Sequence, residues 1–348
     1  MRFRYLFAPL AITLLALLAG CGGGPAPEDP MPEAPVAMPD TPVPPTTTQP
    51  QPEPTTPPVT ETETTASVIV TRDFGETALV SEEIIIGENT TALDAIKAAA
   101  EVETQYGGGF ISAIEGLGTS YGGGGTAAED WFFYVNGIAA RVGAGAYTLS
   151  PGDVEHWDYH DWGFRQLIPA LIGDFPEPFL HGTGGIVYPT RVVYQTDWED
   201  AANTITDMLA GVGITNVAAR TWDELTADER ENSNLIIVGE PDFAPITELN
   251  EPWERLGFFA HFEDGVLKTF DIGGAAAGEY GAETGIIQAT QNIWNPDGIG
   301  AGENVVWMVS GTDEAGVAAA VQALTTRRDE FRYAAAVVAA NDAVVRVP

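Results

Sequence analysis

Two stretches of sequence decide the fold of the first half of this chain: Trp131-Phe132-Phe133-Tyr134-Val135-Asn136-Gly137 and Pro151-Gly152-Asp153-Val154-Glu155-His156-Trp157. The first is rich in the β-branched and aromatic residues that predict a β-strand, and the second leads from a Pro-Gly-Asp turn into a strand expected from Val154 to Tyr159. Asn136-Gly137 predicts a tight hairpin turn that sets the register of the strands beside it. Alternation along the first strand places Trp131 and Phe133 on one face and Phe132 and Tyr134 on the other, so one of the two sets belongs to the core.

The residues around these stretches predict one compact α+β domain at residues 67–162. Residues 66–75 and 77–86 have the pattern of two strands joined at a turn. Residues 91–102 change to helical spacing and begin with a capping box of Thr91 and Asp94. Further strands are expected at residues 110–114, 131–135 and 154–159. Several strands and a single helix favour a sheet packed on that helix, as in a β-grasp-like fold.

A family resemblance rests on the order of five short segments. The pattern W-x-x-Y-V-N-G at residues 131–137 is followed by G-D-x-x-x-W at residues 152–157, and the segments 91–95, 109–117 and 143–147 stand in the expected order. This arrangement resembles the transcobalamin-like C-terminal domain, which occurs in the animal cobalamin carriers transcobalamin and intrinsic factor and in many bacterial surface lipoproteins. The resemblance implies a β-grasp-like domain and suggests cobalamin or another corrinoid as ligand. Bacterial members of the family can bind other ligands or none.

Aromatic side chains with polar edges are the candidate ligand contacts of this domain. Such rings pack against a large flat ligand and still form hydrogen bonds. Glycine loops at residues 107–109 and 122–125 would let a ligand lie against backbone amides. The predicted ligand-binding residues are Tyr106, Tyr121, Trp131, Tyr134, Asn136, Trp157, Tyr159 and Trp162. The alternative role of each aromatic residue is packing in the core. The alternative role of Asn136 is to form the hairpin turn without contacting a ligand.

Two histidines raise the question of a metal site. His156 and His160 flank residues 157–159, and a neutral imidazole ligates cobalt, zinc or copper. On a strand, their spacing of four keeps both on one face. Asp158 and Asp161 could join them, but the sequence holds four histidines and no repeated ligand pattern. A solvated, acidic strand end is therefore predicted, with no metal site.

An α/β domain with a mainly parallel sheet is predicted for residues 179–348, after a connection at residues 163–178. Continuous apolar runs at residues 235–238 and 305–309 are typical of buried parallel strands. One helix is expected after a capping box at residues 196–199 and another after residue 312, so strands and helices alternate.

No motif for catalysis stands out in this second domain. Ser310 lacks the G-x-S-x-G elbow of serine hydrolases, and the chain has no G-x-G-x-x-G motif and no P-loop. Gly239 and Gly311 follow strands, where α/β sheets commonly place ligands, but packing and helix capping explain them as well. We expect a protein that is not an enzyme, has no catalytic residue and requires no cofactor.

The N-terminus predicts export and lipid attachment. Arg2 and Arg4 precede an apolar run at residues 6–18, and Leu18-Ala19-Gly20-Cys21 resembles the bacterial lipobox. Residues 1–20 are then a signal peptide and Cys21 carries the lipid. Residues 22–66 hold fourteen prolines, ten threonines and no Lys or Arg, so residues 21–66 form a lipidated, disordered tether. The protein is expected outside the cytoplasm, in contact with the membrane only through this lipid.

The net charge of the chain limits the classes of partner that it can bind. Fifty acidic and fifteen basic side chains give a formal charge of -35, which opposes binding to nucleic acids and to anionic lipid surfaces. Only seven of the acidic residues lie in the tether, so the excess belongs to the folded domains. The function expected from these features is capture of a ligand, with a corrinoid for uptake suggested by the resemblance, and a small molecule or a transporter as partner. The alternative is a structural or adhesive surface lipoprotein that contacts protein or wall glycan.

Overall fold

The computed structural model describes residues 64–120 and 128–348. The described residues form one compact unit, which contains mostly strands and a few helices. Cys21, Tyr121, the glycines at 122–125 and almost all of the predicted tether lie outside the described residues. Thr65 and Ala66, which the sequence assigned to the tether, already belong to the first strand. No helix in the described part of the chain is long and apolar enough to cross a membrane.

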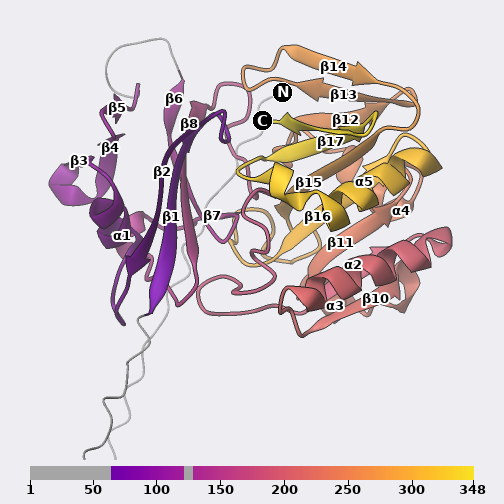
Figure 1. Cartoon of the computed structure of the whole chain (residues 1–348), viewed down its shortest axis with the longest axis horizontal. Helices are drawn as coiled ribbons and strands as arrows, with labels where there is room; N and C mark the ends of the chain where they lie inside the picture. Colours follow the sequence, from indigo (N-terminus) through magenta and orange to yellow (C-terminus); the bar gives the residue numbers. More distant parts are fainter. Residues whose placement is uncertain (1–63, 121–127) are drawn as a thin grey trace, which may run out of the picture. The chain divides into compact units, whose positions relative to one another are not determined.

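The first sheet has five strands in the order β2-β1-β8-β6-β7 (Figure 1). Its strands are β1 (Thr65–Arg72), β2 (Thr77–Ile85), β6 (Glu129–Val135), β7 (Ile138–Ala139) and β8 (Val154–Asp161). β1 runs parallel to β8, and the other neighbours are antiparallel. A small antiparallel sheet accompanies it, made of β3 (Val102–Gln105), β4 (Phe110–Ile114) and β5 (Leu117–Gly118). Two short 3-10 turns complete this half, η1 (Tyr106–Gly108) and η2 (Ala144–Ala146).

One helix, α1 (Ala92–Ala99), packs on the first sheet. The predicted capping box is confirmed, because Thr91 and Asp94 each accept a hydrogen bond from the other's backbone N–H. Ala92, Ala95 and Ile96 are the buried residues of the helix and share a core with residues of β1, β6 and β8. The predicted hairpin turn is also confirmed: Val135 pairs with Ile138, and both intervening residues, Asn136 and Gly137, have positive φ.

The second sheet has seven strands in the order β10-β9-β11-β16-β15-β17-β18. Its strands are β9 (Thr190–Tyr194), β10 (Val217–Thr221), β11 (Asn234–Gly239), β15 (Gly285–Gln291), β16 (Val305–Gly311), β17 (Ala336–Ala340) and β18 (Ala343–Val347). The three pairs from β10 to β16 are parallel, and the three pairs from β16 to β18 are antiparallel.

The prediction of a mainly parallel sheet is therefore not confirmed, because the sheet is mixed. β15 pairs antiparallel with both β16 and β17. The sequence did not predict this strand, because its Gly, Gln and Thr residues interrupt any continuous apolar run. The segment between β15 and β16 contains no helix that could cross over the sheet, so the two strands are antiparallel neighbours.

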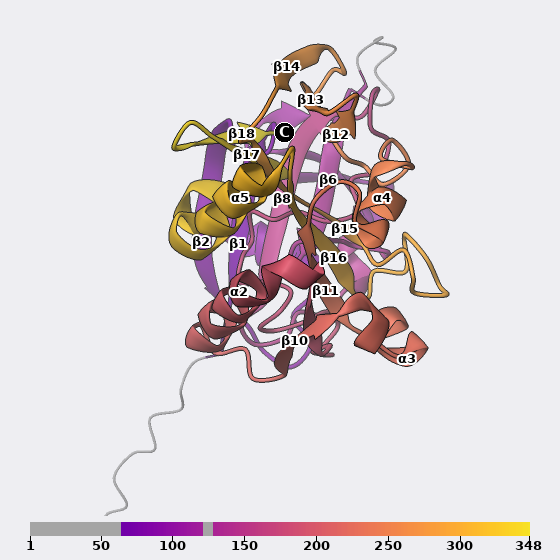
Figure 2. The ribbon, with the colours of Figure 1, turned by 90° about the vertical axis from the view of Figure 1, so that its right-hand side faces the viewer.

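Helices cover one face of the second sheet, and a helix with a small sheet covers the other. α2 (Glu199–Gly211) and α5 (Glu314–Thr326) lie side by side on the first face (Figure 2). The opposite face holds α4 (Ala244–Asn250) and an antiparallel sheet of β12 (Ala260–Glu263), β13 (Val266–Phe270) and β14 (Ala276–Tyr280). The remaining short elements are the 3-10 turns η3 (Thr196–Trp198), η4 (Trp222–Glu224) and η5 (Arg328–Phe331) and the α-helix α3 (Ala227–Glu231). Ile236 and Val238 face the first layer and Leu235 and Ile237 the second, so β11 is buried on both sides.

The connection at residues 163–178 is part of the core. Leu171 and Ile172 are fully buried and belong to different faces of the second sheet. Phe74, from the turn between β1 and β2, and Tyr134 of β6 share one of these cores with Leu171 and with residues of β11 and β16. Apolar packing therefore continues from the first sheet into the second.

Candidate functional site

Most of the predicted ligand contacts lie in the core. Trp131, Tyr134, Trp157 and Tyr159 are all buried. Trp131 and Tyr159 donate to the backbone carbonyls of Leu117 and Gly118, at 2.9 and 3.0 Å. Trp131, Trp157 and Tyr159 share the core of α1 and so fix β6 and β8 against α1 and the small sheet, whereas Tyr134 packs on the other side, in the core next to the second sheet.

Asn136 is also buried and is used within the protein. Its amide donates to Asp153 at 2.8 Å and to the carbonyl of Gly182 at 2.7 Å, and its side-chain oxygen accepts from the N–H of Val154 at 2.7 Å. These bonds join the hairpin turn to the start of β8 and to the loop at residue 182. Asn136 therefore has a structural role that the turn prediction alone did not include.

Two of the predicted contacts remain within reach of solvent. Tyr106 is 87% exposed at η1, where its ring meets the edge of Phe110. Trp162 is half-buried just after β8. Tyr121 lies outside the described residues. Of the other seven predicted residues, the structure buries five and leaves Tyr106 and Trp162 within reach of solvent.

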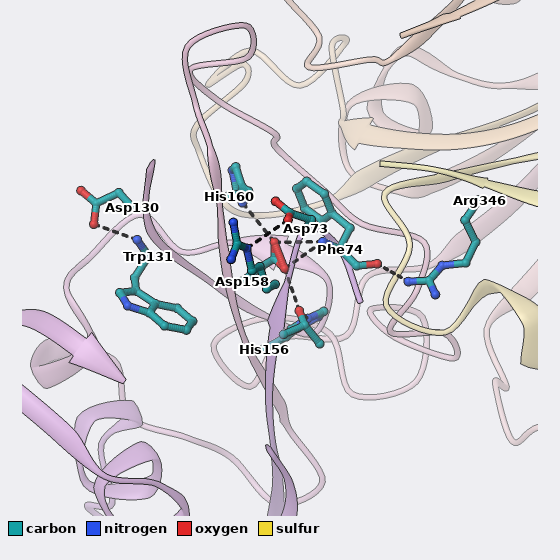
Figure 3. Close-up of polar contacts among 10 residues, drawn as sticks. Asp73, Phe74, Asp130, Trp131, His156, Asp158, His160 and Arg346 are labelled. Atoms are coloured by element: carbon teal, nitrogen blue, oxygen red, sulfur yellow. Dashed lines mark hydrogen bonds and ion pairs between the residues drawn. The ribbon is translucent and has the colours of Figure 1, made fainter. Parts of the chain in front are cut away.

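A buried network of charged and polar side chains lies on the other face of β8. Alternation along the strand sends Trp157 and Tyr159 toward α1 and sends His156, Asp158 and His160 the opposite way. All three are buried, so the prediction of a solvated strand end is wrong. The physical reason is that the second half of the chain covers this face, which strand patterning alone does not reveal. Figure 3 shows the group around Asp158.

Asp158 is the centre of this network. Its carboxylate accepts from the N–H of Phe74 at 2.9 and 3.1 Å and from the Oγ1 of Thr71 at 2.7 Å. His160 Nδ1 lies 3.2 Å away and donates to the same carboxylate, while its ring stacks on Phe132 at 4.4 Å between centroids. Asp158 thus ties the turn after β1 to β8.

His156 lies between two carboxylates. Its Nδ1 is 2.8 Å from Oδ1 of Asp174, and its Nε2 is 2.8 Å from Oγ1 of Thr71. Thr71 gives its only proton to Asp158, so its oxygen accepts from Nε2, and both ring nitrogens then carry protons. Burial by itself lowers the pKa of His156, but the charge and hydrogen bond of Asp174 and the charge of Asp158 outweigh it and raise the pKa. The geometry is that of a buried imidazolium.

Arg346, from β18, adds a second cation. Its guanidinium donates to the carbonyl oxygen of Phe74 (Figure 3). Burial lowers the pKa of Arg346, and the nearby carboxylate of Asp158 opposes that change. Tyr134 borders the same network, and burial together with Asp158 and Asp174 raises its pKa well above the usual value. The network is an electrostatic joint between the two halves of the chain.

Part of this joint lies in a segment that matches a known protein family. Residues 89–161 match a domain of unknown function, DUF4430. The DUF4430 match includes α1, β6 and β8, and therefore His156, Asp158 and His160, whereas Thr71, Asp174 and Arg346 lie outside it. No curated protein matches the chain.

Metal binding has no support in the part of the chain that the structure describes. Across residues 64–120 and 128–348, no group of three His, Cys, Asp or Glu residues is placed to hold a metal ion. His156 and His160 both lie on β8, but they do not share a carboxylate: His156 is paired with Asp174 and His160 with Asp158.

A cleft of about 700 Å³ lies beside the network, and we call it the β1–β2 cleft. One wall is made by Ser67 and Ile69 of β1 and by Ser81 of β2, and the other by Phe175, Val212, Arg328, Arg332 and Tyr333. Asp174 links the cleft to the network: it lines the cleft, its Oδ1 holds His156, and its buried Oδ2 has no partner among the described residues.

Sequence reasoning missed the residues that make this cleft and joint. Asp174, Arg332 and Tyr333 stand in segments without a motif, and only the tertiary structure brings them to β1. The alternation His156-x-Asp158-x-His160 was the one signal available, because three polar residues on one strand face beside an aromatic core face indicate a second buried contact.

Proposed function

We propose that this chain is an extracytoplasmic, lipid-anchored protein that captures a small ligand in the β1–β2 cleft and does not catalyse a reaction. Lipid attachment at Cys21 rests on the lipobox. Cobalamin or another corrinoid is the first ligand to test, because of the resemblance of residues 67–162 to the transcobalamin-like domain. The same resemblance, the parallel pairing of β1 with β8 and the packing of α1 support a β-grasp-like arrangement of the first sheet.

The β1–β2 cleft is the observation that carries the proposal. Its volume of about 700 Å³ falls within the range of roughly 300–1,000 Å³ that is usual for small-molecule sites. Such sites are common where two folded parts of a chain meet. Here the first sheet supplies one wall and the segments at residues 173–176 and 328–333 supply the other.

The lining suits a ligand with both apolar and polar parts. Ile69, Phe175 and Val212 offer apolar surface, and Arg328 stands 5.7 Å from the centroid of the Phe175 ring. Arg332 stands 4.9 Å from the centroid of the Tyr333 ring. No carboxylate of the described residues lies within ion-pair distance of either arginine. Arg328 Nη1 already donates to the carbonyl oxygen of Thr325 at 3.0 Å, so the remaining N–H groups of Arg328 and the guanidinium of Arg332 are the donors that a polar ligand group would meet.

The experiment is a titration of the full chain, purified in detergent, with cobinamide and with cobalamin. We expect a saturable change in the visible spectrum of the corrinoid. Ile69→Trp fills the cleft from β1 and should weaken binding at least about tenfold, whereas Val345→Trp, on the exposed strand β18, should leave it unchanged. Corrinoid binding that Ile69→Trp does not weaken would place the ligand elsewhere. Absence of saturable binding at high micromolar concentration would eliminate corrinoids.

A second candidate function is adhesion to a protein or wall glycan. It is favoured by three exposed apolar side chains, Val142, Ile186 and Val187. Val142 and Ile186 line a hollow of about 280 Å³ together with Tyr147 and Tyr188. If adhesion is the function, cell-wall fractions retain the full chain, Val142→Asp with Ile186→Asp abolishes retention, and corrinoid titration fails. Retention that survives this double substitution would exclude this surface.

A further inference from the structure

Arg165 is a buried cation in the connection between the two halves of the chain. Only 5% of its surface is exposed. Its guanidinium lies over the ring of Phe164, 3.7 Å from the centroid, and over the ring of Trp253, 4.6 Å from the centroid. Trp253 in turn stacks on His261 and Phe270, at 4.0 and 5.1 Å between centroids. Arg165 is thus held against a packed aromatic wall.

The hydrogen bonds of Arg165 are incomplete on one edge. Nε donates to the carbonyl of Phe258 at 2.9 Å, which fixes the side chain. Nη1 makes only a long 3.4 Å bond to the carbonyl of Phe164, and the buried Nη2 has no partner among the described residues. No carboxylate in that part of the chain lies within ion-pair distance of this guanidinium. Burial lowers the pKa of Arg165, and the charge of Glu254 only partly opposes this.

An unpaired buried cation needs an explanation in a chain with fifty acidic side chains. Arg165 lines an open cleft of about 690 Å³, which we call the Arg165 cleft. Phe164, Leu167, Pro252 and Trp253 give this cleft apolar walls, and Leu167 is 43% exposed. On the Nη1–Nη2 fork, Nη2 has no partner among the described residues and Nη1 has only the long bond to Phe164, and the spacing of the fork matches the two oxygens of a carboxylate.

From this geometry we infer that the Arg165 cleft binds a monocarboxylate with an apolar tail, the carboxylate on the Nη1–Nη2 fork and the tail on the apolar walls. Glu251 and Glu254 also line the cleft and oppose a phosphate or a dicarboxylate more strongly than a single negative charge. The site is separate from the β1–β2 cleft and does not depend on the proposed function.

The test uses the full chain in detergent and hexanoate as the probe, with hexanamide as its neutral counterpart. We expect saturable heat of binding for hexanoate and none for hexanamide. Arg165→Lys keeps the charge but loses the fork, and Arg165→Gln loses both, so each should weaken binding at least about tenfold. Arg255→Gln, at the exposed rim of the same cleft, is the matched control and should bind almost as tightly as the natural chain.

A second readout does not depend on the folding of a variant. The ¹⁵N resonance of the Arg165 side chain should shift when hexanoate is added to the natural chain. A free organic acid and a peptide C-terminus present the same carboxylate, so acetyl-Gly-Leu and its amide are added as a further pair. Tighter binding of acetyl-Gly-Leu than of hexanoate identifies a peptide end as the source, and the reverse identifies a free acid. Equal binding of acid and amide, no saturable binding of either acid, or an Arg165→Lys variant that binds normally would overturn the inference.

Discussion

Carboxyl groups at positions 155 and 158 of β8 are both buried but have opposite surroundings. Asp158 faces the joint, where an imidazolium, a guanidinium and three hydrogen-bond donors surround it. Glu155 faces the other way and has one partner, the indole N–H of Trp157 at 2.6 Å, while its Oε2 has none among the described residues. Burial, only partly offset by that hydrogen bond, raises the pKa of Glu155 to about 8. Residues 155 and 158 are three positions apart, an odd number, and therefore lie on opposite faces of β8: Asp158 accepts several hydrogen bonds, whereas Glu155 stays protonated at neutral pH.

The first prediction concerns Glu155→Gln. The folded chain holds the Glu155 proton up to about pH 8, whereas the unfolded chain releases it near 4.5. The contribution of Glu155 to stability is therefore present below pH 4.5 and is lost as the pH rises toward 8, at about 1.4 kcal/mol per unit of pH. Glu155→Gln has no proton to lose, so its free energy of unfolding, relative to the natural chain, should rise between pH 5 and 8. Urea unfolding at several pH values measures the difference, and a constant difference would contradict the assignment.

One glycine in the connection, Gly173, decides how closely this segment approaches the residues before β17. Gly173 exchanges backbone hydrogen bonds with the segment before β17: its N–H donates to Ala334 at 3.0 Å, and its carbonyl accepts from Tyr333 at 3.1 Å. A Cβ at Gly173 would stand 2.3 Å from the backbone nitrogen of Ala334, so no side chain fits. Tyr333 meets this contact with φ of 71°, a conformation that costs a non-glycine residue energy, and its ring lies edge-on to His156 at 5.7 Å. The joint is therefore closed by backbone contact as well as by charge.

The second prediction concerns Gly173→Ala. The methyl group would force apart two backbone segments that cannot rotate away, so we expect a loss of about 3 kcal/mol or more in the free energy of unfolding. Gly143→Ala is the matched control, since a Cβ there meets nothing within 4 Å and φ is -65°. Its effect should stay within about 0.5 kcal/mol. Chemical denaturation of both variants tests this, and equal effects would show that the close approach is not needed.

The two large sheets of the described residues share a core. Leu171 is fully buried in this core, together with Phe74 from the turn between β1 and β2 and with residues of β11 and β16. The buried network adds a polar contact over the same boundary, the hydrogen bond from Arg346 to the carbonyl oxygen of Phe74. Apolar and polar contacts at one boundary couple the two sheets, so the molecule should unfold as a unit.

The third prediction follows from this coupling. Leu171→Ala removes apolar contacts at the boundary and should cost about 2–5 kcal/mol. Because the sheets are coupled, amide exchange should quicken by the same factor in β1 and β16. Leu79→Ala, on the exposed side of β2, is the control and should change neither. Faster exchange in β1 alone would show that the first sheet unfolds independently.

The sequence by itself determined the local structure: the strands around residues 131–135 and 154–159, the helix with its Thr91–Asp94 cap and the Asn136-Gly137 turn. These features depend on periodicity and on backbone preferences of neighbouring residues, which a sequence states directly. The mixed direction of the second sheet, the burial of His156, Asp158 and His160, and both clefts depend on which distant segments meet. Polar residues that alternate along a strand give the same sequence pattern whether their face is covered by water or by another layer of the protein. Only the tertiary structure, by placing Asp174, Tyr333 and Arg346 against β1 and β8, decided that this face is a buried joint.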